Sequence, residues 1–312
     1  MREYTTTNSN PFVDISHQVW AWEIPVYLFL GGLVAGMMVI SGYLLLSDRW
    51  QKPKSVAYVL PAWSLVLLSL GMLALFLDLE HKLYVWRLYL TFEITSPMSW
   101  GSWILILVYP ALLANLVIAL PNALKGRFPS LATLSDRMQE RPWVLRSIAV
   151  VNVALGIMVG IYTGILLSSL GARPLWSSGL LGPLFLVSGV STAAALVHLL
   201  AKEPEERAFA VRADIGLLVT ELVFIVLFLI GLMNASRVQQ EAASMLLGGP
   251  FTAVFWVLVV GLGVLVPMVI QSLAVARRIG HTHVAPLLVI AGGLVFRFVM
   301  VNAGQLSHWT PT

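Results

Sequence analysis

Eight long apolar runs constrain this chain more than any other feature of its sequence. A helix needs about 20 mostly apolar residues to cross the hydrocarbon core of a bilayer. Each run is close to that length, so the sequence predicts an all-α, polytopic membrane protein with eight transmembrane helices. The predicted spans cover residues 24–46, 56–77, 98–120, 148–170, 183–200, 215–233, 251–275 and 284–301.

The composition agrees with this fold class. Hydrophobic residues make up 58% of the chain and charged residues 11%, whereas an average globular domain has roughly 45–50% and about 25%. So few charges cannot cover the surface of a soluble protein of 312 residues, which excludes a soluble enzyme and a disordered chain. The polar start, MREYTTTNSNPFVDISHQ, lacks an apolar core, so we expect no cleavable signal peptide.

The lysines and arginines predict the orientation. The N-terminus, the C-terminus and the loops after spans two, four and six hold 5 of the 19 basic residues, and the loops after spans one, three, five and seven hold 13. Because cytoplasmic loops carry the excess of Lys and Arg, we expect both termini to lie outside. The net charge of +4 then reflects membrane orientation and does not indicate a nucleic-acid partner.

The spans fall into two sets of four. We interpret residues 1–312 as a single integral membrane domain made of two four-helix bundles, residues 1–170 and 171–312. A short internal sequence repeat supports this division, because Leu28-Phe29-Leu30 opens the first span and Leu184-Phe185-Leu186 opens the fifth. Chance similarity between leucine-rich helices is the alternative.

Several polar side chains are expected near the outer ends of the helices. Glu23 and Tyr27 begin the first span, Asp78 ends the second, and Tyr162 lies in the fourth. Acids and tyrosines gathered on one side suit a ligand with an apolar body and a polar head that exchanges protons. An interfacial aromatic belt would explain Tyr27 and Trp22 equally well, and Asp78 could simply end a helix.

A second polar set is expected inside the membrane. Ionisable groups at membrane depth are costly and are usually functional. His198 and Glu221 lie toward the inner side, Asn152 lies between the two sides, and Arg297 lies near the outer end of the last span. The alternatives are a neutral, hydrogen-bonded Glu221, a solvated His198, and an Arg297 that reaches the lipid headgroups.

The sequence excludes several kinds of chemistry. The chain has no cysteine, so it offers no thiolate for an iron–sulfur cluster. A haem with two histidine ligands needs facing histidines in the spans, and only His198 lies clearly in one. No phosphate-binding loop of an ATP-driven pump is present. Two classes of protein remain. One is a quinone-reactive subunit that receives electrons from a cofactor of a partner subunit. The other is a proton-coupled transporter with Glu221, His198 and Arg297 lining its path.

Several motifs resemble one family, the polysulfide reductase membrane subunits, also called NrfD-like. The similarity extends over nearly the whole chain, and the serine–proline–methionine–serine string is its most specific part. In chain order the matching segments are Trp20–Leu33, Asp78-Leu79, Ser96–Trp103, Tyr162-Thr163-Gly164, Arg297-Phe298 and Ala303-Gly304-Gln305.

This resemblance implies a function as well as a fold. Members have eight or nine helices, bind no haem, metal or iron–sulfur cluster, and oxidise quinol or reduce quinone (menaquinone or ubiquinone) near one membrane face. They exchange electrons with a ferredoxin-like iron–sulfur subunit. That subunit connects to a catalytic subunit with molybdopterin or to a multihaem cytochrome. The resemblance thus implies a multi-pass protein of a bacterial or archaeal cytoplasmic membrane.

The resemblance also implies roles for individual residues. Tyr162 matches the family's quinone-binding tyrosine, whereas the asparagine and histidine that the family places on the first helix are replaced here by Ile24 and Tyr27. We therefore expect Tyr162, Glu23 and Asp78 to act catalytically, with Arg297 balancing buried carboxylates. The full predicted quinone site is Tyr27, Tyr162, Trp22, Glu23, His17 and Ser96, and the predicted proton path is Glu221, His198, Arg297 and Asn152.

Overall fold

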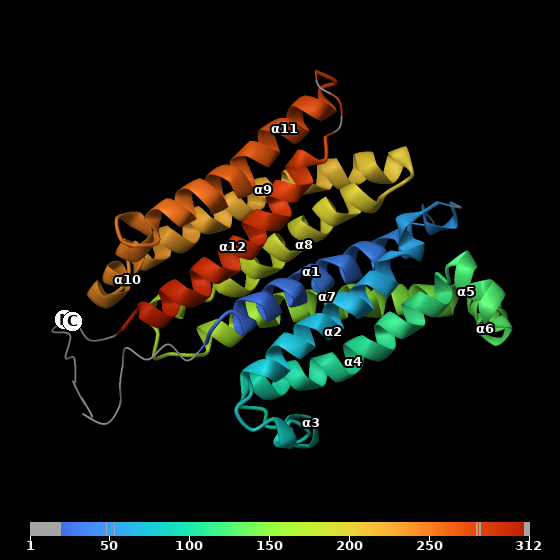
Figure 1. Ribbon diagram of the computed structural model, residues 1–312, viewed down its shortest axis with the longest axis horizontal. Coiled ribbons are helices and arrows are strands. Elements are labelled where there is room, and N and C mark those ends of the chain that lie inside the picture. The colour runs from blue at the N-terminus through green and yellow to red at the C-terminus, as the bar shows by residue number, and fades with distance from the viewer. Residues whose placement is uncertain (1–19, 48, 53, 279, 281, 309–312) are drawn as a thin grey trace.

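The computed structural model describes residues 20–308 except 48, 53, 279 and 281, and this part of the chain is helical and contains no strand (Figure 1). Eight helices in it are long and apolar enough to cross a membrane, which confirms the predicted fold class. They are α1 (Glu23–Leu46), α2 (Leu60–Asp78), α4 (Pro97–Ile118), α7 (Pro142–Ser168), α8 (Leu181–Leu200), α9 (Pro204–Met233), the segment Val254–Val275, and α12 (Val284–Leu306). The segment Val254–Val275 consists of a π-helix, η5 (Val254–Leu265), followed by α11 (Val266–Val275).

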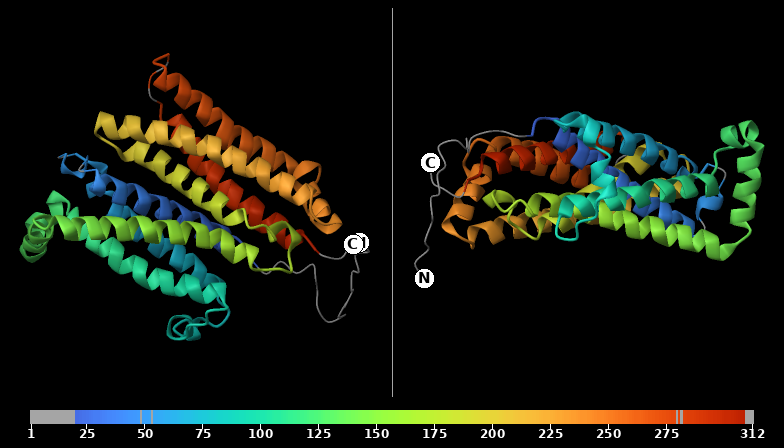
Figure 2. Two further views of the ribbon diagram at one scale, coloured as in Figure 1. Left: turned by 180° about the vertical axis from the view of Figure 1, so that it is seen from behind. Right: turned by 90° about the horizontal axis from the view of Figure 1, so that it is seen from below.

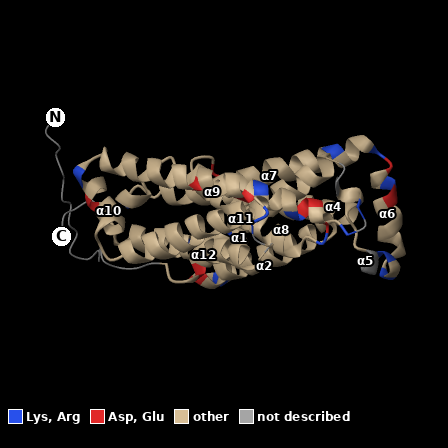
Figure 3. Ribbon diagram, turned by 90° about the horizontal axis from the view of Figure 1, so that it is seen from above, with Lys and Arg blue, Asp and Glu red and all other residues tan. Residues whose placement is uncertain are grey.

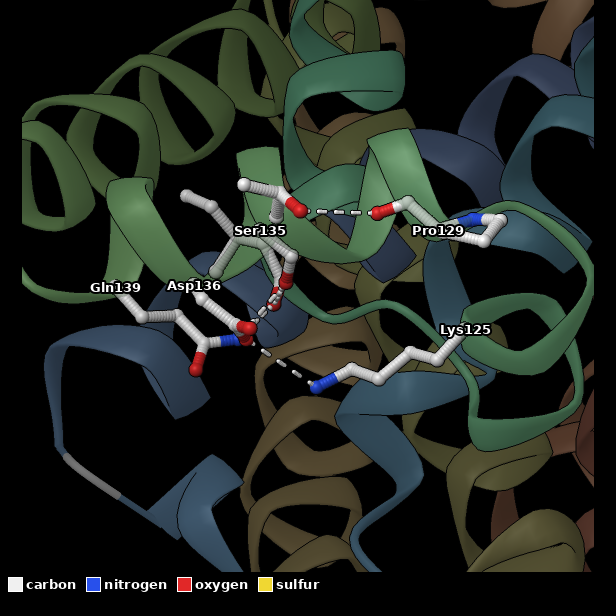
Figure 4. Close-up of polar contacts among 7 residues, drawn as sticks. Lys125, Pro129, Ser135, Asp136 and Gln139 are labelled. Carbon is white, nitrogen blue, oxygen red and sulfur yellow. Dashed lines mark hydrogen bonds and ion pairs between the residues drawn. The ribbon is translucent and has the colours of Figure 1, made fainter.

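Short helices connect these spans. The pair α5 and α6 lies at one end of the molecule and α10 at the other (Figures 1 and 2). Lys125 and Asp136 form an ion pair of 3.9 Å between α5 and α6, and the Gln139 amide donates to the Ser135 hydroxyl (Figure 4). The connecting elements are η1 (Arg49–Gln51), η2 (Val56–Tyr58), η3 (Lys82–Tyr84), α3 (Arg87–Leu90), α5 (Asn122–Arg127), α6 (Pro129–Gln139), η4 (Pro174–Trp176) and α10 (Arg237–Leu247).

Two helices extend well beyond their apolar runs. The sixth span begins at Pro204, where the sequence suggested 215, because hydrogen bonds from the α1–α2 connection and from α8 compensate the buried acids Glu206 and Asp214 in its first three turns. The last span continues to Leu306, where the sequence suggested 301. Arg297 is therefore nine residues before the end of α12, about 14 Å along the axis. The expectation that Arg297 lies near the outer end of its helix is wrong.

Helix α1 is the central element of the fold. It packs against α2, α7, α8 and α12, and 72% of its most apolar stretch is buried, against 33% for α2. Its close approach to α8 depends on glycine: a Cβ on Gly36 would overlap Ala193, and a Cβ on Gly189 would overlap the backbone of Gly32. Small residues allow such contacts between helices in a membrane.

The remaining contacts between helices form mainly within each half of the chain. Helices α1, α2, α4 and α7 contact one another in the first half of the chain, and α8, α9, α11 and α12 do so in the second. The two sets meet through α1, α7, α8 and α12. The helices carry long stretches without a charged residue (Figure 3), as lipid-facing surfaces require. The division at residue 170 and the outward termini stay predictions.

Candidate functional site

A cavity of about 610 Å³ lies where the start of α1, the end of α2, the start of α4 and the end of α7 meet. This volume is within the usual range of small-molecule sites, about 300–1,000 Å³. The segment 79–96, which links α2 to α4, forms one wall and is exposed along much of its length. The lining is mostly apolar, with polar groups contributed by Tyr27, Asp78, Glu80, His81, Tyr84, Arg87, Tyr89, Ser102 and Tyr162.

Four tyrosines line this cavity: Tyr27, Tyr84, Tyr89 and Tyr162. Tyr27 and Tyr162 are buried, and the phenols of Tyr162 and Tyr89 lie close enough to Tyr27 to interact with it electrostatically. Neither the Tyr27 nor the Tyr162 hydroxyl is hydrogen-bonded to another residue in the described part of the chain. Burial raises the pKa of Tyr89, and Tyr109 raises it further. A Cβ on Gly101 would overlap the Tyr162 phenol, so α4 needs glycine there.

Serines at the start of α4 hold the connecting segment in place. The Ser102 hydroxyl donates to the Leu88 carbonyl oxygen at 2.8 Å, and the Ser99 hydroxyl donates to that of Thr91 at 3.2 Å. The Ser99 hydroxyl in turn accepts the Glu93 N–H at 3.0 Å. Ser99, the last residue of the serine–proline–methionine–serine motif, and Ser102, three residues further along α4, therefore hold this wall of the cavity through their hydroxyl groups.

Charged groups of both signs surround the opening. Asp78 interacts electrostatically with Glu23 and Lys82. The Arg87 guanidinium lies 4.5 Å from the centre of the Tyr84 ring, a favourable cation–π distance. One carboxylate oxygen of Glu23 is buried without a hydrogen-bond partner among the described residues. Acids that can exchange protons thus stand beside an apolar cavity lined by phenols.

A second polar cluster lies between α8, α9 and α11. Asp214 accepts hydrogen bonds from the Ser191 hydroxyl and from the Gln271 amide, both at 2.6 Å. Two helical turns further along α9, Glu221 accepts a hydrogen bond from Ser188. All five side chains are buried. Two serines of α8 therefore satisfy two acids on one face of α9.

Arg297 extends this cluster to α12. Its guanidinium interacts electrostatically with Glu221, donates to the Phe185 carbonyl oxygen at 2.9 Å, and lies 3.9 Å from the centre of the Phe185 ring. Arg297 is 1% exposed, so it does not reach the headgroups. It is a buried cation beside a buried acid, the arrangement in which charges inside membranes are usually found.

Comparison with known proteins identifies the family. The profile described as polysulphide reductase, NrfD, matches residues 8–308. This chain belongs to the NrfD family. It is 30% identical to one of the polysulfide reductase chains of Wolinella succinogenes, over 92% of this chain and 94% of that protein. It is 31% identical to protein NrfD of Escherichia coli, over 93% and 96% of the two chains.

A more distant relative of this NrfD-family protein is a selenate reductase subunit of Mesobacillus selenatarsenatis. The two are 23% identical over 92% of this chain and 74% of the relative. The family model and these relatives confirm the resemblance that the motifs suggested. Together with the eight apolar helices, family membership establishes a multi-pass membrane protein.

The fold of this NrfD-family chain brings together part of the predicted quinone site. Tyr27, Tyr162 and Asp78 line the cavity, and Glu23 lies beside Asp78. Trp22 is 52% exposed and does not line it. Ser96 does not line it either; its carbonyl oxygen accepts the N–H groups of Ser99 and Trp100 at the start of α4. His17 lies outside the described residues.

Sequence reasoning did not select several lining residues. Tyr89, Arg87 and Ser102 all line the cavity. Tyr89 and Arg87 belong to an irregular connection whose course no periodicity predicts. Ser102 had a usable signal, because Met98, Gly101, Ser102 and Leu105 recur at the spacing of one helical face.

The predicted proton path is divided by the fold of the NrfD-family protein. Glu221 and Arg297 interact, whereas the Asn152 amide donates to the Ala111 and Ile148 carbonyl oxygens between α4 and α7. His198 is buried near the end of α8. Asp214 was missed because the predicted span began at residue 215. Its spacing of seven residues from Glu221, two helical turns, was the available signal.

Proposed function

We propose that this NrfD-family protein is the quinone- or quinol-reactive membrane subunit of an oxidoreductase complex, and that the reaction takes place in the cavity beside Tyr27 and Tyr162. The observation that carries the proposal is the cavity itself, about 610 Å³ in volume and apolar apart from phenols and a rim of charged groups. Two of the relatives are named as parts of a polysulfide reductase and a selenate reductase, which supports a place in a reductase complex.

The lining residues suit a menaquinone or ubiquinone substrate. A quinol that is oxidised gives up electrons and protons. The Tyr27 and Tyr162 hydroxyls would hydrogen-bond its head-group oxygens, and Ile24, Leu75 and Leu105 would enclose its ring. Asp78 at the opening, with Glu23 next to it, would receive the protons, since carboxylates within reach of a reacting oxygen act as general bases.

The electrons require a partner. Because the chain has no cysteine, we propose a ferredoxin-like iron–sulfur subunit as the acceptor or donor. It would lead to a catalytic subunit with molybdopterin or to a multihaem cytochrome. Its docking surface would be the segment 79–96, where Leu83 is 88% exposed and Leu90 is 72% exposed. Large exposed apolar residues beside a cavity commonly mark a protein interface.

Copurification tests this arrangement. Leu83→Glu with Leu90→Glu should cause the iron–sulfur partner to be lost from the purified complex, because charges would replace the apolar contacts. Leu134→Glu, on exposed α6, is the matched control and should retain the partner. Retention of the partner by the double variant would contradict the docking surface. Substrate transport by the purified protein with no partner at all would instead support the transporter alternative.

We infer that the cavity faces the outside of a bacterial or archaeal cytoplasmic membrane. The support is the distribution of basic residues, 13 of 19 of which lie between apolar runs one and two, three and four, five and six, and seven and eight. The cavity lies at the opposite ends of α1 and α2 from the loop that joins them. Protons released there would leave on the outer side.

Proton translocation is a second candidate function. Its support is the buried face of α9, on which Glu206, Asp214 and Glu221 are all buried, with Arg297 of α12 beside Glu221. Three acids along one helix would provide successive proton acceptors from the cytoplasmic end toward the middle of the membrane. Asp214 replaces Asn152 in this path, because Asn152 lies between other helices.

A further inference from the structure

A second cavity, of about 420 Å³, lies at the other end of α1 and α2 from the cavity described above. It is bounded by the loop between these helices, by Pro121 after α4, and by the end of α8. Two lysines line it, Lys54 from the loop and Lys202 after α8. The positive-inside distribution assigns this end to the cytoplasm.

The start of α9 fixes the shape of this cavity. Glu206 is 2% exposed and accepts hydrogen bonds from the Ser55 hydroxyl at 2.5 Å and the Val56 N–H at 2.9 Å. Lys52 pairs with Glu205 at 2.6 Å. These contacts engage Glu205 and Glu206 and hold the loop against the start of α9.

The two lysines of the cavity remain available for a ligand. Neither Lys54 nor Lys202 forms an ion pair with any residue in the described part of the chain, and both are exposed. Polar and apolar groups share the lining, with Tyr58 and Gln51 beside Val59 and Leu200. A ligand that fits must therefore combine negative charge with an apolar part.

We propose that this second cavity binds the phosphate-bearing headgroup of an anionic phospholipid through Lys54 and Lys202. Basic pockets between transmembrane helices on the cytoplasmic side bind such headgroups. Val59 and Leu200 would contact the glycerol and the first carbons of the acyl chains, which a free phosphate ion lacks. The lipid would join the α1–α2 loop to the end of α8. The site is independent of the quinone cavity and of its proposed function.

Lipid binding to the full-length protein, purified with its bound subunits and stripped of native lipid, tests the site. The probes are phosphatidylglycerol, phosphatidylcholine and inorganic phosphate, and native mass spectrometry measures the bound lipid. We expect one tightly held phosphatidylglycerol and much weaker phosphatidylcholine. Each basic residue contributes about a five-fold change in affinity, so Lys54→Gln with Lys202→Gln should weaken binding roughly 30-fold.

Controls separate charge at the cavity from charge elsewhere and from misfolding. Arg127→Gln with Arg137→Gln removes two exposed cations from the same end of the molecule and should leave phosphatidylglycerol binding unchanged. Lys54→Arg with Lys202→Arg should bind as the parent does. Three outcomes would overturn the proposal: parental affinity in the double glutamine variant, equal binding of the neutral lipid, or complete displacement of the lipid by inorganic phosphate.

Discussion

Gly101→Ala is expected to reduce quinol oxidation about 100-fold. The new methyl group would overlap the Tyr162 phenol and push it from its place in the cavity, and a displacement of about 1 Å in a reacting site can cost a factor of roughly 10². Tyr162→Phe keeps the ring and removes only the hydroxyl, so we expect a smaller loss, about 10-fold. The measurement is quinol oxidation by membranes that contain the complete complex, with an artificial electron acceptor.

Matched variants give this prediction its controls. Gly126→Ala adds the same methyl group where, beyond the adjacent residues and the backbone of its own helix, no described atom lies within 4 Å, and its rate should equal that of the parent. Glu23→Gln should slow the reaction by impairing proton release. Parental rates for both Tyr162→Phe and Glu23→Gln would contradict the assigned quinone site, whatever the effect of Gly101→Ala.

The second large effect is expected at Arg297. Arg297→Leu removes the cation that interacts electrostatically with the buried Glu221 and the hydrogen bond to the Phe185 carbonyl oxygen, and the loss of such buried polar interactions costs about 1–3 kcal/mol of unfolding free energy. The double variant Arg297→Leu with Glu221→Leu should regain at least half of that loss, since no unpaired charge remains. Denaturation of the detergent-solubilised protein measures both values as a double-mutant cycle.

An exposed charge on α9 provides the comparison. Arg212→Leu, at the exposed surface of that helix, should change the free energy of unfolding by less than about 0.5 kcal/mol. If Arg297→Leu were equally mild, or if the double variant were as unstable as the sum of the single ones, Arg297 would not be balancing Glu221.

Proton coupling is tested separately from stability. Glu221→Gln and Asp214→Asn preserve the size of each side chain but cannot lose a proton. In proteoliposomes containing the complete complex, both variants should oxidise quinol at close to the parental rate while proton movement across the membrane falls by at least about 10-fold. Parental turnover together with parental charge separation would show that α9 carries no proton path.

The sequence predicted the eight spans because bilayer thickness sets the length of an apolar run. It misplaced the start of α9 because acids usually mark the end of a membrane span. Glu206 and Asp214 are exceptions, since Ser55 and Ser191, each from a different part of the chain, supply their hydrogen bonds. Such pairing depends on tertiary packing, which hydropathy does not report.

The sequence predicted only those residues of the candidate site that lie on regular helices. Tyr27, Tyr162 and Asp78 lie on regular helices, so their depth follows from their position in the sequence. Tyr89 and Arg87 reach the cavity only because serines of α4 fix the course of an irregular segment. Asn152 was grouped with Glu221 by depth alone, and depth does not distinguish one pair of helices from another.

Photolabelling with an azidoquinone tests the central claim most directly. A light-activated quinone added to the complete complex should label residues that line the cavity of about 610 Å³, among them Tyr27, Met98 and Tyr162, and excess natural quinone should prevent the labelling. Labelling confined to the apolar groove of about 470 Å³ between α4 and α7, beside Pro110 and Asn152, would contradict the proposed quinone site.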